Sequence, residues 1–338
     1  MKPRIFVTNF NRNFTGVSAT AANVVRAQMD RYDLSLVGHP LPGCPAPITL
    51  KQARAASRHP CIWHVRRNTE MRAAIWARDV LRLPIEIVFT SAAQRRHSAF
   101  PRWLISRMDA IVATTQTAAG FVPNVRAVVP HGVDTKVYSP AVNRAAAWAS
   151  LGYGGTSGIA TIGRIRPEKG SDQFVNAMIE LLPHHPETVA LLIGRAAREH
   201  QTFQQDLKAK IAAAGLSDRI QFVGEIAADQ MPNVMRALSV VVQLPRYEGY
   251  GMVPLEGMAS GVPFVGTDAG YYRSFSAQGT TGTVVETAGA AAKAAAHILN
   301  GNVEDMGLNA RAVALKTFSA QSEADGIDAV YQELIAQR

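Results

Sequence analysis

Two glutamates flank a glycine-rich turn in the second half of the 338-residue chain. Glu248 precedes Gly249-Tyr250-Gly251, and Glu256 follows Pro254, which suits the first turn of a helix because its missing N–H is not needed there. A turn between a strand and a helix leaves backbone N–H groups free to bind an anion such as phosphate. The spacing allows both carboxylates to face a ligand at the helix start. Alternatively, Glu248 caps the turn and Glu256 is an ordinary solvated helix residue.

A second strand-to-helix loop, at residues 163–170, carries several cations. A guanidinium group binds phosphate oxygens in pairs, and an ammonium group adds a point charge, so Arg164 and Lys169 are predicted to bind a diphosphate. Alternatively, this is a basic surface loop in which Arg166 pairs with Glu168. Gly16 follows the first strand-like segment, but its surroundings match no known phosphate-loop pattern and equally fit a plain turn.

No metal motif accompanies these loops. The chain has no Asp-x-Asp sequence, and its nine histidines lack the spacing of metal ligands. If the protein binds a substrate with a phosphorylated leaving group, Arg164, Lys169 and helix N–H groups would have to balance the charge of that group. We therefore expect that no metal or other cofactor is required.

Short apolar runs alternate with helix-length segments along the chain, which predicts an α/β fold with parallel sheets. A region rich in turn formers, near residues 130–140, separates two such series, so the sequence predicts two doubly wound domains. Ligands bind at the carboxyl ends of parallel strands, which makes a cleft between the domains the expected site. The Ala-rich segment 288–297 is expected to be an exposed helix, and a further helix is expected to start at Ser322-Glu323. Strands are predicted at 4–9, 34–38, 60–65, 85–90, 109–114, 126–129, 159–163, 189–193, 220–223, 239–243, 263–266 and 283–285, and helices in the first series at 18–30, 50–57, 69–81, 98–107 and 115–121.

Composition excludes several classes of protein. A chain that is 47% apolar can form full hydrophobic cores, which excludes dominant disorder. Its two cysteines, Cys44 and Cys61, lie in no CxxC motif and indicate a reducing compartment. No apolar run approaches the roughly 18 residues of a membrane span, and the start of the chain has no signal-peptide pattern. We expect a soluble, cytoplasmic protein.

The net charge of +9 is unevenly distributed. Residues 1–134 contain 18 Lys and Arg against 7 Asp and Glu, whereas residues 135–338 contain 17 against 19. The first part is therefore basic, which indicates an anionic partner: a nucleic acid, an acidic membrane surface or an anionic substrate.

Several motifs together resemble retaining glycosyltransferases of the GT-B fold, family 4. They are Glu248-x7-Glu256, Gly163-Arg164 with Lys169, the hinge-like Pro130-His131-Gly132-Val133-Asp134, and Ile220-Gln221-Phe222-Val223-Gly224. Segments 66–71 and 89–98 of the first domain resemble more narrowly the lipopolysaccharide core mannosyltransferases of α-proteobacteria. Those enzymes add mannose from GDP-mannose to an inner-core Kdo residue.

The resemblance implies a division of the chain and roles for individual residues. Residues 1–137, with 323–338 packing back on them, would form an acceptor-binding domain, and 138–322 a nucleotide-sugar-binding domain. Arg164 and Lys169 would bind the donor diphosphate, Glu256 the ribose and Glu248 the transferred sugar. The remaining donor contacts would come from Gly16, Gly163, Val223, Gly224, Gly249, Tyr250 and Gly251.

Two positions depart from the family pattern. Many members have a histidine directly after the fourth strand, where this chain has Thr90-Ser91, so His97 is the nearest candidate for a catalytic contact. His131 occupies the position of an asparagine in the hinge motif, and its role is open. In the first domain, Arg66, Arg67, Arg95, Arg96 and Arg102 would face an acidic acceptor displayed on an anionic membrane surface, or they are dispersed surface charges.

The predicted reaction is transfer of a hexose, with retention, from a sugar nucleotide to an acceptor hydroxyl. A UDP-hexose donor and a GT-B sugar-nucleotide epimerase are the enzymatic alternatives. A basic nucleic-acid-binding protein is the non-enzymatic one, although no RNA- or DNA-binding motif accompanies Trp63, Trp76 and Trp103. A nicotinamide-dependent dehydrogenase would need a GxGxxG motif after the first strand, and residues 9–18 lack it.

Overall fold

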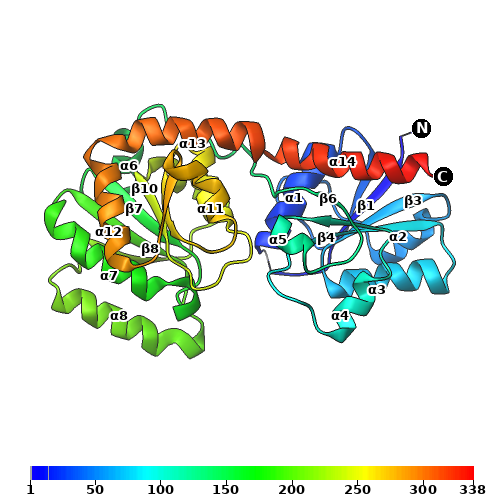
Figure 1. Ribbon diagram of the computed structural model, residues 1–338, viewed down its shortest axis with the longest axis horizontal. Coiled ribbons are helices and arrows are strands. Elements are labelled where there is room, and N and C mark those ends of the chain that lie inside the picture. The colour runs from blue at the N-terminus through cyan, green and yellow to red at the C-terminus, as the bar shows by residue number, and fades with distance from the viewer. Residues whose placement is uncertain (1, 14) are drawn as a thin grey trace. The chain divides into compact units, whose positions relative to one another are not determined.

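The computed structural model describes residues 2–13 and 15–338, except for the side chain of residue 302 (Figure 1). The chain divides into two compact units: unit 1 comprises Met1–Gly132 and Phe318–Arg338, and unit 2 comprises Val133–Thr317. Each unit contains one six-stranded sheet, and every strand pairing in both sheets is parallel. The predicted α/β class and the twelve predicted strands are confirmed.

Unit 1 has the strand order β2-β1-β3-β4-β5-β6. The C-terminal helix α14 returns to this unit and packs beside α1 (Figure 1). The elements of unit 1 are β1 (Arg4–Asn9), α1 (Gly16–Gln28), β2 (Asp33–Gly38), α2 (Leu50–Ala56), β3 (Cys61–Val65), α3 (Asn68–Ile75), a π-helical turn (Trp76–Val80), β4 (Ile85–Ser91), α4 (Ala99–Ile105), β5 (Ala110–Ala113), α5 (Gln116–Ala119), β6 (Val125–Val128) and α14 (Ala320–Ala336).

Unit 2 has the strand order β12-β11-β10-β7-β8-β9. Its elements are α6 (Arg144–Leu151), β7 (Ser157–Ile162), α7 (Ser171–Leu181), β8 (Thr188–Ile193), α8 (Gln201–Ala213), β9 (Ile220–Gly224), α9 (Met231–Ala237), β10 (Val240–Gln243), α10 (Met252–Ala259), β11 (Phe264–Thr267), α11 (Tyr272–Phe275), β12 (Gly282–Val285), α12 (Ala288–His297) and α13 (Val303–Thr317), together with 3₁₀ turns at Pro167–Lys169, Leu182–His184, Arg198–His200 and Ala277–Gly279 and a π-helical turn at Ile298–Asn302.

Both sheets are covered by helices on their two faces, which explains the continuous apolar character of the strands. In unit 1, one face packs Trp63 and Phe89 against α3, while the other packs Val88 and Val112 against Ile327 of α14 and its neighbours. In unit 2, strands β7, β8 and β10 pack against α7 and α12. The rigid sheets therefore fix the positions of the loops that leave their edges.

Three expectations from the sequence need correction. Helix α12 is not fully exposed, because its alanines at 291, 292 and 295 are buried, and their small side chains let it pack closely on α7. Helix α14 begins at Ala320 and not at Ser322-Glu323, because the side chain of Ser319 accepts a hydrogen bond from the backbone N–H of Ser322 and caps the helix.

The domain boundaries lie about five residues earlier than 137 and 322, at Gly132 and Thr317. Arg311 of unit 2 donates hydrogen bonds to the backbone carbonyls of Thr135 and Tyr138, which fixes the segment after Gly132 to that unit. On the other side, Gly132 lies close against the backbone of Ser319, so the start of α14 belongs to unit 1.

The topological switch points bring the predicted motifs together within each unit. In an open parallel sheet, ligands bind where neighbouring strands send their connections in opposite directions. In unit 2 this point lies between β7 and β10, which are followed by the loops 163–170 and 244–251. In unit 1 it lies between β1 and β3, which precede Gly16 and Arg66-Arg67.

Gly170 lets the loop after β7 lie directly against the loop after β10. Its φ is +71°, and a Cβ atom there would lie 1.8 Å from the carbonyl oxygen of Leu244. We expect Gly170→Ala to reduce the free energy of unfolding by about 3 kcal/mol or more, since the variant combines backbone strain with displacement of the second loop. Urea denaturation measures this loss.

Gly152 is the matched control, because its φ is +73° and a Cβ atom there would meet nothing within 4 Å. Gly152→Ala should cost only about 1 kcal/mol, the strain of the left-handed backbone. Equal losses in the two variants would contradict the close-packing argument.

Candidate active site

Lys169 and Glu248 meet at the switch point of unit 2. The Nζ atom of Lys169 donates a hydrogen bond of 2.6 Å to Oε2 of Glu248, and Oε1 of Glu248 accepts one of 2.9 Å from the backbone N–H of Gly249. Both side chains retain about a fifth to a quarter of their exposure. Glu248 therefore caps its own turn, as the simpler interpretation proposed, and also orients the lysine predicted to bind phosphate.

The two loops are joined by a residue that sequence reasoning missed. Arg246 donates from its Nη1 atom to Oδ1 of Asp172 on α7 at 2.8 Å, and its backbone N–H donates to the carbonyl oxygen of Glu168 at 3.0 Å. The signal that could have found it is its position two residues before Glu248. Arg246 thus holds the loop after β10 on the start of α7.

The other cations of the loop after β7 are arranged differently. Arg164 is exposed, with its neighbour Ile165 buried in the core. The alternative pairing of Arg166 with Glu168 is present, with Nε and Oε2 3.7 Å apart. Gly163 has φ +150° and free space around its Cα, so the loop has room for a ligand at its start.

Glu256 is a partly buried residue of α10, not a solvated one. Burial raises the pKa of its carboxyl group from 4.5 to about 7, and a hydrogen bond with the side chain of Tyr138 opposes this rise. Tyr138 was not predicted from the sequence. Burial therefore favours the protonated form of this carboxyl group, whereas the hydrogen bond with Tyr138 favours the charged form.

Gly251, Tyr250 and Gly224, which were predicted to contact the donor, have different surroundings. Gly251 has φ +99° and lies against the ring of Tyr272, where any side chain would clash. Tyr250 is buried and stacks on Tyr271 with ring centroids 5.3 Å apart, so its ring serves the core while its backbone remains in the turn. At the end of β9, Gly224 has φ +77°, and its carbonyl accepts a 2.7 Å hydrogen bond from the N–H of Gly194.

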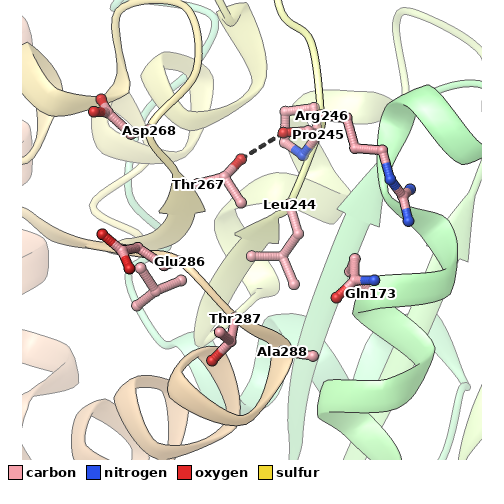
Figure 2. Close-up of a pocket in the computed structure, with 10 residues that line it drawn as sticks. Gln173, Leu244, Pro245, Arg246, Thr267, Asp268, Glu286, Thr287 and Ala288 are labelled. Atoms are coloured by element: carbon pink, nitrogen blue, oxygen red, sulfur yellow. Dashed lines mark hydrogen bonds between the residues drawn. The ribbon is translucent and has the colours of Figure 1, made fainter.

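A pocket of about 520 Å³ in unit 2 is lined in part by Leu244, Pro245 and Arg246, which begin the loop that carries Glu248 (Figure 2). It is lined by the end of β10, the ends of β11 and β12, and Gln173 of α7. Asp268 and Glu286 contribute carboxylates, and the predicted Arg164, Lys169, Glu248 and Glu256 do not line it. This pocket therefore borders the loop of the predicted phosphate site without including its predicted side chains.

In unit 1, Arg67 fastens the loop that precedes α1. Its Nη1 atom donates to Asn9 and Glu70, both at 3.1 Å, and its Nη2 atom donates to Thr15 and Ser18 at 3.2 and 3.1 Å. The guanidinium group of Arg67 is therefore held by four partners within the protein, and its contact with an acceptor stays a prediction. The same contacts hold the start of α1, where Gly16 is exposed and a Cβ atom would meet nothing within 4 Å.

Glu70 is a fully buried carboxylate that sequence reasoning missed. It accepts hydrogen bonds from the hydroxyl of Thr8 at 3.0 Å and from the backbone N–H groups of Phe10 and Arg66 at 3.1 and 2.8 Å, besides that from Arg67. The ends of β1 and β3 are therefore held together by one side chain. Its signal was a lone glutamate in the first turn of α3.

The two histidines in the centre of unit 1 have internal partners. His64 of β3 bonds to the hydroxyl groups of Thr90 and Tyr331, and burial lowers its pKa so that it stays neutral. The Nδ1 atom of His131 lies 2.8 Å from Oε1 of Glu323 on α14. His131 therefore joins the hinge segment to the terminal helix.

The remaining predicted residues of unit 1 differ in their burial. Arg66 is buried, whereas Arg95 and Arg96 are exposed. His97 is partly buried, and its Nε2 atom has no hydrogen-bond partner among the residues that the structure describes. These residues follow β3 and β4, on the edge of the sheet that also carries Arg67 and Gly16.

Comparisons with known proteins agree with this architecture. Residues 150–313 match the family model for glycosyl transferases group 1. The chain is 37% identical, over 98% of its length and 96% of the other chain, to the lipopolysaccharide core biosynthesis mannosyltransferase LpcC of Rhizobium leguminosarum bv. viciae. It is also 37% identical, over 98% of its length and 97% of the other, to the lipopolysaccharide core biosynthesis mannosyltransferase LpsB of Rhizobium meliloti.

The crystal structure of Anabaena Alr3699/HepE in complex with UDP and glucose matches with a TM-score of 0.79, covering 98% of this chain and 100% of that one at 16% identity. At this identity the likeness concerns the fold, and the two parallel six-stranded sheets agree with the GT-B architecture. The chain therefore belongs to the glycosyl transferases group 1 family and is a glycosyltransferase of the GT-B fold.

Proposed function

We propose that this glycosyltransferase transfers mannose from GDP-mannose to a Kdo residue of the lipopolysaccharide inner core, with retention at the anomeric carbon. The names and near-complete coverage of the two rhizobial relatives support the choice of mannose and of the lipopolysaccharide core. The observation that carries the proposal is the contact of Lys169 with Glu248 at the switch point of unit 2. It would place a cation for the diphosphate beside a carboxylate for the sugar hydroxyls.

The donor would lie along the carboxyl edge of the unit 2 sheet. Lys169 and the exposed Arg164 would bind the diphosphate, and Glu248 would accept hydrogen bonds from hydroxyls of the transferred sugar. Glu256 would bind the ribose hydroxyls. Val223 and Gly224, at the end of β9, would frame the base, since they lie on the same edge of the sheet.

In the proposed reaction, the bond from the anomeric carbon to the diphosphate oxygen breaks and a bond to the acceptor oxygen forms on the same face. The transition state resembles an oxocarbenium ion, with negative charge growing on the leaving diphosphate. Arg164 and Lys169 would stabilise that charge. The leaving phosphate oxygen would take the proton from the acceptor hydroxyl.

We also propose that the reaction needs no bound metal. Within residues 2–13 and 15–338, no group of three or more His, Cys, Asp and Glu is placed to hold a metal ion. Cations of the protein would then supply the electrostatic stabilisation that a divalent metal supplies elsewhere.

A membrane-bound acceptor requires a surface that meets the bilayer, and we propose that α4 provides it. Phe100 and Trp103 are each about half exposed, and their rings stack with centroids 6.2 Å apart. Arg96 and Arg102 line an adjacent hollow of about 590 Å³. Aromatic rings beside guanidinium groups suit the interface of an anionic membrane. No helix of the described residues is long and apolar enough to cross a membrane.

The direct test is mannose transfer from GDP-mannose to a synthetic Kdo-containing acceptor in the presence of EDTA. We expect the wild-type protein to be active, and Lys169→Ala to lower kcat/KM by about 100-fold or more because the leaving group loses a preorganised cation. Lys293→Ala, which removes an exposed lysine of α12, should leave the activity unchanged.

Calorimetry with GDP and UDP tests the donor separately. Tighter binding of UDP would overturn the assignment of GDP-mannose. Loss of activity with EDTA that magnesium or manganese restores would overturn metal independence, and full activity of Lys169→Ala would remove the diphosphate role of this lysine.

Glu256 makes stability depend on pH. Because its pKa is about 7 in the folded state and about 4.5 when unfolded, the folded state binds more protons in between, and stability falls as the pH rises through this range. We expect Glu256→Gln to be more stable than the wild type at pH 8 by up to about 3 kcal/mol, and equally stable near pH 4.5, by urea denaturation. The same variant should bind GDP more weakly at pH 8.

Two outcomes would contradict this assignment. A stability difference that does not change between pH 4.5 and pH 8 would show that the carboxyl group does not titrate in this range. Unchanged GDP affinity in the variant would remove the ribose-binding role.

The membrane surface is tested with vesicles of phosphatidylethanolamine and phosphatidylglycerol. The double variant Phe100→Ser, Trp103→Ser should bind them about tenfold more weakly than the wild type, because two aromatic side chains no longer enter the interface. Leu308→Ser is the control, since Leu308 is an exposed apolar residue of α13. Equal binding of the double variant and the control would show that α4 does not contact the bilayer.

A further inference from the structure

Arg66 is a buried cation whose guanidinium group has no hydrogen-bond partner within the described part of the chain. Its side chain is 8% exposed, and none of its Nε, Nη1 and Nη2 atoms finds an acceptor among the residues that the structure describes. Buried polar groups in folded proteins almost always have partners, and a buried charge needs one most. An unpaired guanidinium group therefore indicates a position that another molecule completes.

The carboxylates near Arg66 are already engaged with other donors. Glu70 accepts hydrogen bonds from Thr8, Arg67 and two backbone N–H groups. Glu323 accepts from Nδ1 of His131 and from the backbone N–H of Gly132, both at 2.8 Å. Both carboxylates favour the charge of Arg66 through space, yet burial outweighs them and lowers its pKa. The charge of Arg66 is thus destabilised by burial, and its guanidinium group lacks hydrogen-bond partners among the described residues.

Other unsatisfied polar groups lie on the same edge of the sheet. Arg66, Ser91 and Thr114 stand at the carboxyl ends of the adjacent strands β3, β4 and β5, and the hydroxyl groups of Ser91 and Thr114 are buried without partners within the described part of the chain. The alternation of side chains places Arg66 and Thr114 on the face covered by α14, since Ile62 and Val112 belong to that core.

We infer that Arg66 recognises the carboxylate of an acidic acceptor sugar. This inference rests on the proposed function and assigns one residue to the acceptor. A planar guanidinium group binds a carboxylate through two parallel hydrogen bonds. A carboxylate fits better than a phosphate dianion, because the buried Glu70 and Glu323 would repel a second negative charge. The exposed Arg95 and Arg96 have no comparable environment.

The test compares a Kdo glycoside with its analogue in which the carboxyl group is reduced to an alcohol. The wild-type protein should have at least about tenfold lower acceptor KM for the carboxylate form. Arg66→Gln should lose this preference while its KM for GDP-mannose is unchanged. Arg72→Gln, which changes an exposed arginine of α3, should retain the preference.

Thermal unfolding provides a readout that does not depend on catalysis. Arg66→Gln removes an unpaired buried charge, so its Tm should equal or exceed that of the wild type, whereas a structural arginine would leave a less stable variant. The Kdo glycoside should raise the Tm of the wild type and of Arg72→Gln, but not that of Arg66→Gln. Arg66→Lys should recover part of this shift, because it restores the charge without the paired geometry.

Several results would overturn the inference. They are retention of the carboxylate preference in Arg66→Gln, a marked loss of its stability, a larger Tm shift with inorganic phosphate than with the Kdo glycoside, and no Tm shift of the wild type with either probe. Failure of the proposed function is seen separately, as absence of mannose transfer by the wild type although the Kdo glycoside still raises its Tm.

Discussion

All strands of a parallel sheet end at the same edge, and this constraint decides where the charged loops of both units lie. Residues that are far apart in the chain, such as Lys169 and Glu248, become neighbours because β7 and β10 are adjacent. In unit 1, the adjacency of β1 and β3 lets Glu70 bind the ends of both strands. The chemistry of each unit thus depends on strand order, which the buried apolar faces of the sheet hold in place.

The two units treat buried charge in different ways. In unit 2, Lys169 and Glu248 at the switch point neutralise each other. Both side chains remain partly exposed, so that a ligand can reach them. In unit 1, Glu70 and Glu323 are fully used by internal donors, while Arg66 remains unpaired among the described residues. A preorganised cation of this kind costs stability in the absence of a ligand, as binding sites commonly do. The contrast agrees with separate recognition tasks for the two units.

The sequence predicted local features well and long-range polar contacts poorly. Each of the twelve strands lies within two residues of its predicted position, because apolar runs and glycine turns are local signals. Lys169 and Glu248 were both predicted site residues because their motifs abut predicted strands, but the hydrogen bond between them was not predicted. The sequence pattern could not predict the hydrogen bonds of Arg67 to Asn9 and Glu70, or the burial of Arg66. Both depend on side chains that come from several strands and from α14. For the same reason, the contacts of Tyr138 with Glu256 and of Glu323 with His131 were not predicted.

The return of α14 to unit 1 affects the order in which the chain can fold during synthesis. Unit 2 is one continuous segment, Val133–Thr317, and contains all the strands of its sheet. Unit 1 needs Ile327, Tyr331 and their neighbours to complete one face of its core, and these residues are synthesised after the whole of unit 2. Until α14 has been translated, this face of the unit 1 sheet is therefore covered only in part, by residues such as Val24 and Val25 of α1. Unit 2, although it begins later in the chain, is therefore the first unit whose core can be completed during synthesis.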